Sequence, residues 1–125
     1  GTTGYEWLSR DPEVWKAFAA DPLTFDATVL KLFGLADTLR LLGRPRRLNA
    51  ELPMLIMIGD EDSLGGPASI RKLAAAYETR GGLSDVTVTI YPGGRHEMLN
   101  ETNQAEVCAD IIAWLDAHVP SASAG

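Results

Sequence analysis

The apolar run MLIMI at residues 54–58 constrains the fold more than any other feature of the chain. It lies between Pro53 and Gly59, is shorter than a typical helix and does not alternate with polar residues. Such a run is typical of a strand that is buried on both faces of a parallel sheet. We therefore expect a strand over residues 54–58, with other elements covering both of its faces.

The segments that follow this strand alternate between helix and strand. Pro67 begins a predicted helix with one apolar stripe, and the glycine pair 81–82 ends it. Residues 86–91 (VTVTIY) are predicted as a second strand, and a last helix is expected from about Asn103, where Glu106 completes a capping box. The order predicts an α/β fold with a βαβα unit at the edge of a sheet.

The first part of the chain has the pattern of helices alone. Asp11 and Asp21 each precede a proline, an arrangement that favours the start of a helix. The second of these predicted helices has apolar residues at three- and four-residue spacing from Phe25 to Leu39. The predicted divisions are a helical segment over residues 1–48, an α/β part over 49–119 and a flexible tail over 120–125.

Composition limits the partners of the chain. Its net charge of −6 opposes general affinity for nucleic acid or anionic membranes. No apolar run approaches the roughly 20 residues that cross a bilayer, and the start of the chain has no targeting pattern. The single cysteine, Cys108, excludes an internal disulfide. We expect no nucleic-acid partner, no transmembrane segment and a cytoplasmic location.

Titratable side chains follow both predicted strands. Asp60 and Asp62 come after the first strand, and His96 comes after the second and a Pro-Gly-Gly turn. Open α/β sheets place catalytic groups at this end of their strands, and neighbouring strands lie about 5 Å apart. A carboxylate beside an imidazole is the acid and base part of a catalytic triad. The alternative is that these residues are an ordinary turn acid and a surface imidazole.

Three stretches of the chain carry a family resemblance: residues 52–62 (LPMLIMIGDED), 91–101 (YPGGRHEMLNE) and 111–115 (IIAWL). They resemble the C-terminal portion of an α/β-hydrolase, most closely of the monoacylglycerol lipase and lysophospholipase group. The resemblance implies that His96 is the triad base and Asp62 the triad acid, with Asp60 as the second choice. Glu97 and Glu101 are expected to support the histidine loop or the start of the last helix.

The resemblance also implies that residues 1–48 form the helical cap that such enzymes insert between core strands. The side chains expected to contact an acyl group are Trp7, Trp15, Phe18, Phe25, Leu32, Phe33 and Leu64. Ordinary helix packing is the alternative for the cap positions, because helical spacing does not separate the two interpretations. After the acid, Leu64 takes the place of a family valine, whereas the glycines at 65 and 66 depart from the family pattern.

No serine of the chain has the Gly-x-Ser-x-Gly pattern of a nucleophile elbow. In the family the nucleophile and the oxyanion-hole loop lie in the N-terminal half. Two strands alone also leave outer backbone groups unpaired. The chain begins at Gly1 without a methionine, and we expect it to be a processed or truncated part of an enzyme. The remaining half, covalently joined or a separate chain, is then a required partner.

The implied function is hydrolysis of a lipid-like carboxylic ester by a serine hydrolase, to which this chain supplies His96 and Asp62. No cofactor is expected. No metal is expected either, because His96 and Glu97 have no further histidine or cysteine at a ligand spacing. The alternative function is a noncatalytic α/β-hydrolase-like module that binds a partner through its open edge, or an inactive fragment without a nucleophile.

Overall fold

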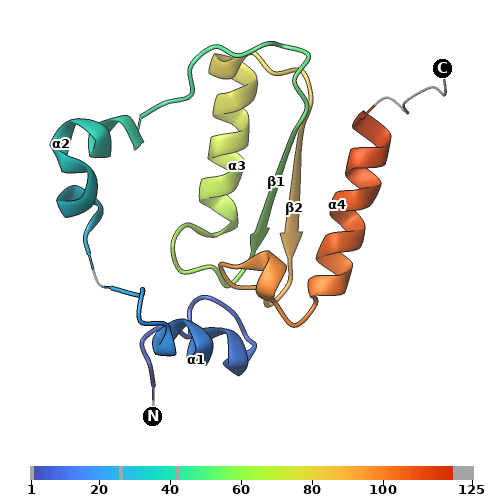
Figure 1. Cartoon of the computed structure of the whole chain (residues 1–125). Helices are drawn as coiled ribbons and strands as arrows, with labels where there is room; N and C mark the ends of the chain where they lie inside the picture. Colours follow the sequence, from blue (N-terminus) through green and yellow to red (C-terminus); the bar gives the residue numbers. More distant parts are fainter. Residues whose placement is uncertain (1, 26, 42, 120–125) are drawn as a thin grey trace, which may run out of the picture.

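The computed structural model describes residues 2–25, 27–41 and 43–119. Its elements in chain order are α1 (Pro12–Ala20), α2 (Val29–Leu41), β1 (Met54–Gly59), α3 (Gly66–Ala76), a π-helical turn η1 (Tyr77–Gly81), β2 (Val86–Tyr91), a 3-10 turn η2 (Met98–Asn100) and α4 (Gln104–His118) (Figure 1). This order confirms the predicted βαβα unit after a helical segment. The tail predicted over 120–125 lies outside the described residues.

The two strands are parallel neighbours, in a register that runs from Met54 opposite Val86 to Gly59 opposite Tyr91. The pairing extends one residue further, because Asp60 N donates to Tyr91 O at 3.1 Å. Both strands therefore end at the same edge of the sheet. The loops that follow them start side by side, as the sequence predicts.

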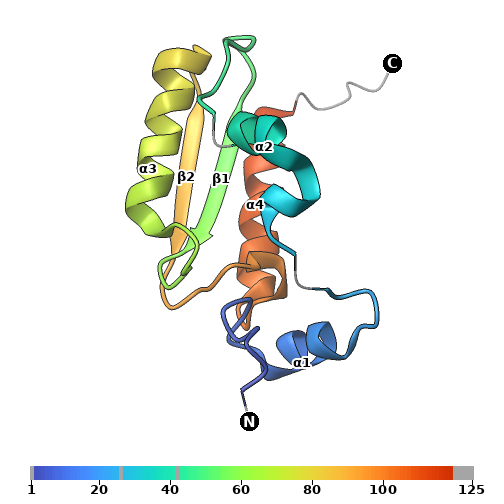
Figure 2. The same cartoon turned by 90° about the vertical axis from the view of Figure 1, so that its left-hand side faces the viewer.

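Helices α3 and α4 lie on opposite sides of the sheet in both views (Figures 1 and 2). On the α4 side, Tyr91, Met98 and Val107 form a buried cluster, against which Met57 and Ile111 pack. Within the described residues only the last two positions of β1, 58–59, are buried, and positions 54–57 are partly covered. Two strands flanked by one helix on each side leave the rest of β1 only partly covered.

The N-terminal helices differ from the prediction at one of their two starts. Asp11 caps α1 through its side chain, as expected. Asp21 instead begins a turn, in which its carboxylate accepts from Leu23 N at 2.8 Å, and α2 starts only at Val29. Phe25 consequently lies outside α2, and Gly34, with φ of 71°, interrupts the helix. The apolar positions therefore do not share one continuous helical face.

The predicted capping box of α4 does not form. Asn103 is the N-cap residue, but its side chain makes no hydrogen bond to the helix backbone. Its amide oxygen accepts from Arg10 Nη2 at 2.9 Å, and its amide nitrogen donates to Glu106 Oε2 at 2.8 Å. Asn103 thus ties α4 to the N-terminal part of the chain.

None of the described helices is both long enough and apolar enough to cross a membrane.

Candidate active site

A histidine and an aspartate meet where the two strands end. His96 Nδ1 lies 3.0 Å from Asp62 Oδ2. The other Asp62 oxygen accepts from Leu64 N at 2.8 Å, which orients the carboxylate by a local turn. The Asp62 side chain is 8% exposed and that of His96 is 40% exposed. A proton on Nδ1 donates to the shielded carboxylate, and this tautomer leaves Nε2 as an acceptor on a ring that is partly open to solvent.

Asp60, the second candidate for the acid, has a different partner. Its Oδ1 accepts from Gly93 N at 2.6 Å, so its carboxylate joins the loop after β1 to the loop after β2. Of the two aspartates, Asp62 is the one that hydrogen-bonds to His96. The two aspartates of this loop thus have different partners: Asp60 bridges the two loops, and Asp62 binds the imidazole of His96.

Glycines let the two loops touch through their backbones. A Cβ built on Gly59 would lie 1.9 Å from the carbonyl oxygen of Gly94. The same carbonyl accepts from Glu61 N at 3.0 Å, and Gly93 has φ of 70°, in the left-handed region that favours glycine. This close approach places Asp62 within hydrogen-bonding distance of His96.

The N-terminal segment, residues 5–10, reaches the same place from the far end of the sequence. Trp7 O accepts from His96 N at 3.4 Å, and Leu8 O accepts from Glu97 N at 2.8 Å. The Trp7 ring lies beside the imidazole, with centroids 5.2 Å apart and an interplanar angle of 52°. Trp7, an expected substrate contact, therefore packs directly against His96.

Glu101 is a buried carboxylate that joins this segment to the histidine loop. It accepts hydrogen bonds from Arg10 N, Arg10 Nε, Arg95 N and Thr102 N, at 2.8 to 3.1 Å. Burial raises the pKa of Glu101, but the hydrogen bonds from Arg10, Arg95 and Thr102 outweigh it and hold the pKa below its ordinary value. The sequence predicted that Glu101 supports the histidine loop or the start of the last helix, but it did not indicate Arg10 and Arg95 as its partners.

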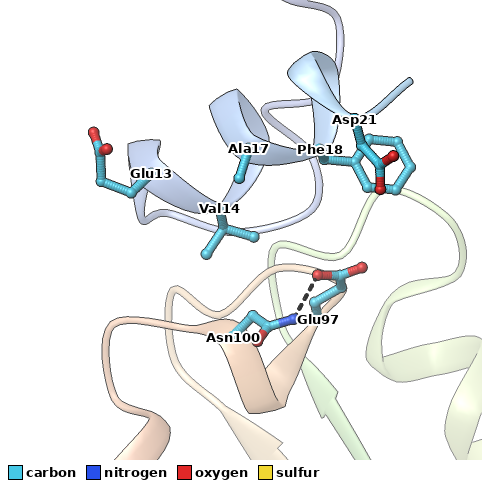
Figure 3. Close-up of a pocket in the computed structure, with 7 residues that line it drawn as sticks. All are labelled: Glu13, Val14, Ala17, Phe18, Asp21, Glu97 and Asn100. Atoms are coloured by element: carbon cyan, nitrogen blue, oxygen red, sulfur yellow. Dashed lines mark hydrogen bonds between the residues drawn. The ribbon is translucent and has the colours of Figure 1, made fainter. Parts of the chain in front are cut away.

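An open pocket of about 550 Å³ lies between α1 and the histidine loop (Figure 3). Its lining residues are Glu13, Val14, Ala17, Phe18, Asp21, Glu97 and Asn100. On the loop side, Asn100 Nδ2 donates to Glu97 Oε2 at 2.8 Å, the bond drawn in Figure 3. The pocket lies next to the imidazole rather than over it, because its lining includes Glu97 but not His96.

Phe18 is the one expected substrate contact that lines this pocket. Trp15 is partly buried on α1, whereas four other expected contacts are exposed, to between 51% and 70%: Phe25, Leu32, Phe33 and Leu64. The structure thus brings Trp7 and Phe18 to the neighbourhood of His96 and leaves Leu32 and Phe33 of α2 exposed.

No serine in residues 2–25, 27–41 and 43–119 hydrogen-bonds to the His96 ring. Ser9, which is buried near the loop, donates to Asn100 O at 2.8 Å and accepts from Asp11 N at 3.0 Å. Its hydroxyl thus joins two backbone segments. The same described residues contain no group of three His, Cys, Asp or Glu side chains that could hold a metal ion.

Comparison with known proteins places this geometry in context. Residues 2–103 match the family described as serine aminopeptidase, S33. The chain is 36% identical over 115 residues to a monoacylglycerol lipase of Mycolicibacterium smegmatis, a match that covers 90% of this chain and 39% of the relative.

Two solved structures have a similar fold. One is a soluble variant of monoglyceride lipase from Saccharomyces cerevisiae, with a TM-score of 0.67 and 20% identity over 91% of this chain and 41% of that chain. The other is a thermostable carboxyl esterase from Bacillus coagulans, with a TM-score of 0.74 and 22% identity over 94% of this chain and 40% of that chain. The chain therefore spans about two fifths of the length of each of these proteins.

Proposed function

Because the chain belongs to the serine aminopeptidase S33 family of α/β-hydrolases, we propose that it is the acid- and base-bearing part of a serine hydrolase that cleaves carboxylic esters. The observation that carries this proposal is the hydrogen bond between His96 and Asp62 at the carboxyl ends of two parallel strands. The relatives named as a lipase and an esterase favour a lipid-like acyl ester, such as an acylglycerol, as the substrate.

We assign residues 1–48 to the cap and residues 49–119 to the C-terminal part of the core. A further N-terminal half, covalently joined or a separate chain, supplies the nucleophilic serine and the oxyanion-hole donors. Two observations support this assignment: the chain spans about two fifths of its relatives' length, and within the described residues each strand pairs only with the other. The outer edges of the strands are then available for the rest of the sheet.

The proposed reaction has two halves. His96 Nε2 takes the proton of the serine hydroxyl as the serine oxygen attacks the ester carbonyl carbon, and Asp62 stabilises the imidazolium through Nδ1–H. The imidazolium then gives its proton to the alcohol oxygen as the C–O bond breaks, which leaves an acyl-enzyme. Water then attacks the acyl carbon as His96 Nε2 takes one of its protons. The bond between the acyl carbon and the serine oxygen breaks, the carboxylic acid leaves, and the imidazolium returns the proton to the serine oxygen.

Trp7 and Phe18 are the proposed acyl contacts nearest the reacting carbonyl, since Trp7 packs on His96 and Phe18 lines the adjacent pocket. The exposed Phe25, Leu32, Phe33 and Leu64, together with Trp15, extend this surface in the proposal. Apolar side chains that remain exposed on α2 suit a cap that closes over an acyl chain and the remaining core.

A fluorophosphonate, which traps activated serines, tests the proposal directly. The purified sample is treated with the reagent, and the intact mass of every species is read under denaturing conditions. We expect an adduct on a heavier species or on a second chain, together with turnover of an acylglycerol and little turnover of an aminoacyl anilide. A homogeneous, unlabelled 13.5 kDa chain would contradict the proposal and favour the noncatalytic binding module.

A further inference from the structure

The Glu101 carboxylate accepts four hydrogen bonds, two on each oxygen. Oε1 accepts from Arg10 N at 3.1 Å and from Arg95 N at 2.8 Å. Oε2 accepts from Arg10 Nε at 2.8 Å and from Thr102 N at 3.0 Å. The side chain has no exposed surface. With two N–H groups directed at each oxygen, the site suits an ionised carboxylate, and a proton on either oxygen would face N–H donors.

One of these donors belongs to the residue that directly precedes His96. Arg95 gives its backbone N–H to Glu101, and its Nη1 donates to Glu6 O at 2.6 Å and to Ser9 O at 3.0 Å. The backbone of Arg95 is therefore held by Glu101 while its side chain holds the N-terminal segment. The histidine loop has little freedom to shift relative to either.

The next donors along the loop are held by the same segment. His96 N and Glu97 N donate to Trp7 O and Leu8 O, at 3.4 Å and 2.8 Å. Arg10, two residues beyond Leu8, returns to Glu101 through both its backbone and its guanidinium. The resulting closed circuit of hydrogen bonds runs from Glu101 to the histidine loop, on to the N-terminal segment and back to Glu101.

We propose that Glu101 is a positioning residue for His96, which sets the place of the imidazole relative to Asp62 and the substrate through Arg95 and through the N-terminal segment. The inference rests on the proposed function. Glu101 acts through other residues, since its four hydrogen bonds go to Arg10, Arg95 and Thr102. A displacement of about 1 Å in such a group can reduce a rate by about 100-fold.

Glu101→Gln tests the proposal with little change of shape. In either orientation, the amide NH₂ of glutamine would face two N–H donors, so two favourable bonds become repulsive contacts. In the complete hydrolase we expect kcat for a short, soluble ester to fall about 100-fold, with KM changed less than about threefold. The downfield NMR signal of the proton between His96 Nδ1 and Asp62 should weaken or disappear.

The matched control is Asp85→Asn. Asp85 Oδ2 lies 3.0 Å from His118 Nε2, at the opposite end of β2, so this change weakens another carboxylate–histidine pair far from the loop. It should leave kcat and the His96 signal unchanged. If Glu101→Gln does not fold, Arg10→Met removes one donor to Glu101 while the backbone donors remain, and a smaller fall in kcat, about fivefold, is expected in the same direction.

The proposal is overturned if the folded Glu101→Gln enzyme keeps the wild-type kcat and the wild-type His96 signal. If only Arg10→Met folds, wild-type values of both quantities overturn it equally. If the wild-type enzyme turns over no ester, the proposed function fails, and the NMR signal still decides whether Glu101 positions the imidazole.

Discussion

Gly59 and Gly94 approach so closely that a Cβ on Gly59 would lie 1.9 Å from the Gly94 carbonyl oxygen. Gly59 ends β1, and Gly94 lies two residues before His96. The contact therefore fixes the point from which the Asp62 loop and the His96 loop diverge. It is a backbone contact, so no side-chain rotation can relieve a bulkier residue at position 59.

Gly59→Ala should accordingly separate the two loops. We expect a loss of stability above the 1–3 kcal/mol typical of overpacking, because the clash is with backbone atoms, and a loss of fluorophosphonate labelling. Gly65→Ala is the control, since a Cβ built on Gly65 would meet Ser69 Cβ at 3.7 Å, an ordinary contact. Thermal unfolding and labelling rates of both variants measure the difference; equal effects would contradict the interpretation.

Asp62→Asn should separate the roles of the two aspartates. Asparagine cannot stabilise the His96 imidazolium as a carboxylate does, and kcat in the complete enzyme should fall steeply, by roughly the 10⁴-fold known for a serine protease. Asp60→Asn keeps an oxygen that can accept from Gly93 N and should change kcat less than about tenfold. Steady-state ester hydrolysis measures both, and the reverse order of effects would transfer the acid role to Asp60.

The lowered pKa of Glu101 predicts a pH-dependent stability. A carboxyl group whose pKa is lower in the folded state contributes stability that is complete above its unfolded pKa, about 4.3, and is lost as pH falls through the folded pKa. At pH 7 the free energy of unfolding of the wild-type protein should exceed that of Glu101→Gln by about 3 kcal/mol. This difference should shrink as the pH falls.

Urea unfolding from pH 7 to pH 3 measures this gap. Glu51→Gln, at an exposed position, is the control and should stay within about 0.5 kcal/mol of the wild type throughout. A gap for Glu101→Gln that does not change with pH would show that shape, rather than charge, determines the effect.

Phe18→Ala should weaken binding of long acyl chains, because Phe18 lines the pocket beside the histidine loop. We expect KM for a long-chain acylglycerol to rise about tenfold, with kcat for a short ester unchanged. Leu23→Ala, at a side chain that is 82% exposed, is the control. Equal KM values for Phe18→Ala and wild type would remove Phe18 from the proposed acyl contacts.

The sequence predicts the βαβα unit well because its signals are local. The unalternating run at 54–58, the Gly81–Gly82 helix stop and the alternating second strand each determine one element, and parallel pairing then brings the acidic loop beside His96. The burial of the first strand is not local in this sense, because it depends on the elements that cover the strand, and positions 54–57 are only partly covered within the described residues.

Two of the differences arise where distant residues compete with local preference, and a third arises from the backbone conformation of one glycine. Asn103 is at a position typical of a helix cap, yet its amide oxygen accepts a hydrogen bond from Arg10, 93 positions earlier in the chain. The role of Glu101 depends on Arg10 in the same way, and no local pattern indicates that contact. At α2, Gly34 adopts a positive φ that a count of apolar spacing does not reveal.

The hydrogen bonds from the histidine loop to Trp7 O and Leu8 O also define where the proposed cap could be exchanged with that of a related hydrolase. Residues 5–10 support His96, the proposed base, so a chimera that replaced them would alter the position of His96 as well as substrate selection. The transferable unit begins after α1, beyond Ala20, where the chain leaves this support. A hybrid joined there would test acyl preference with the imidazole left in place.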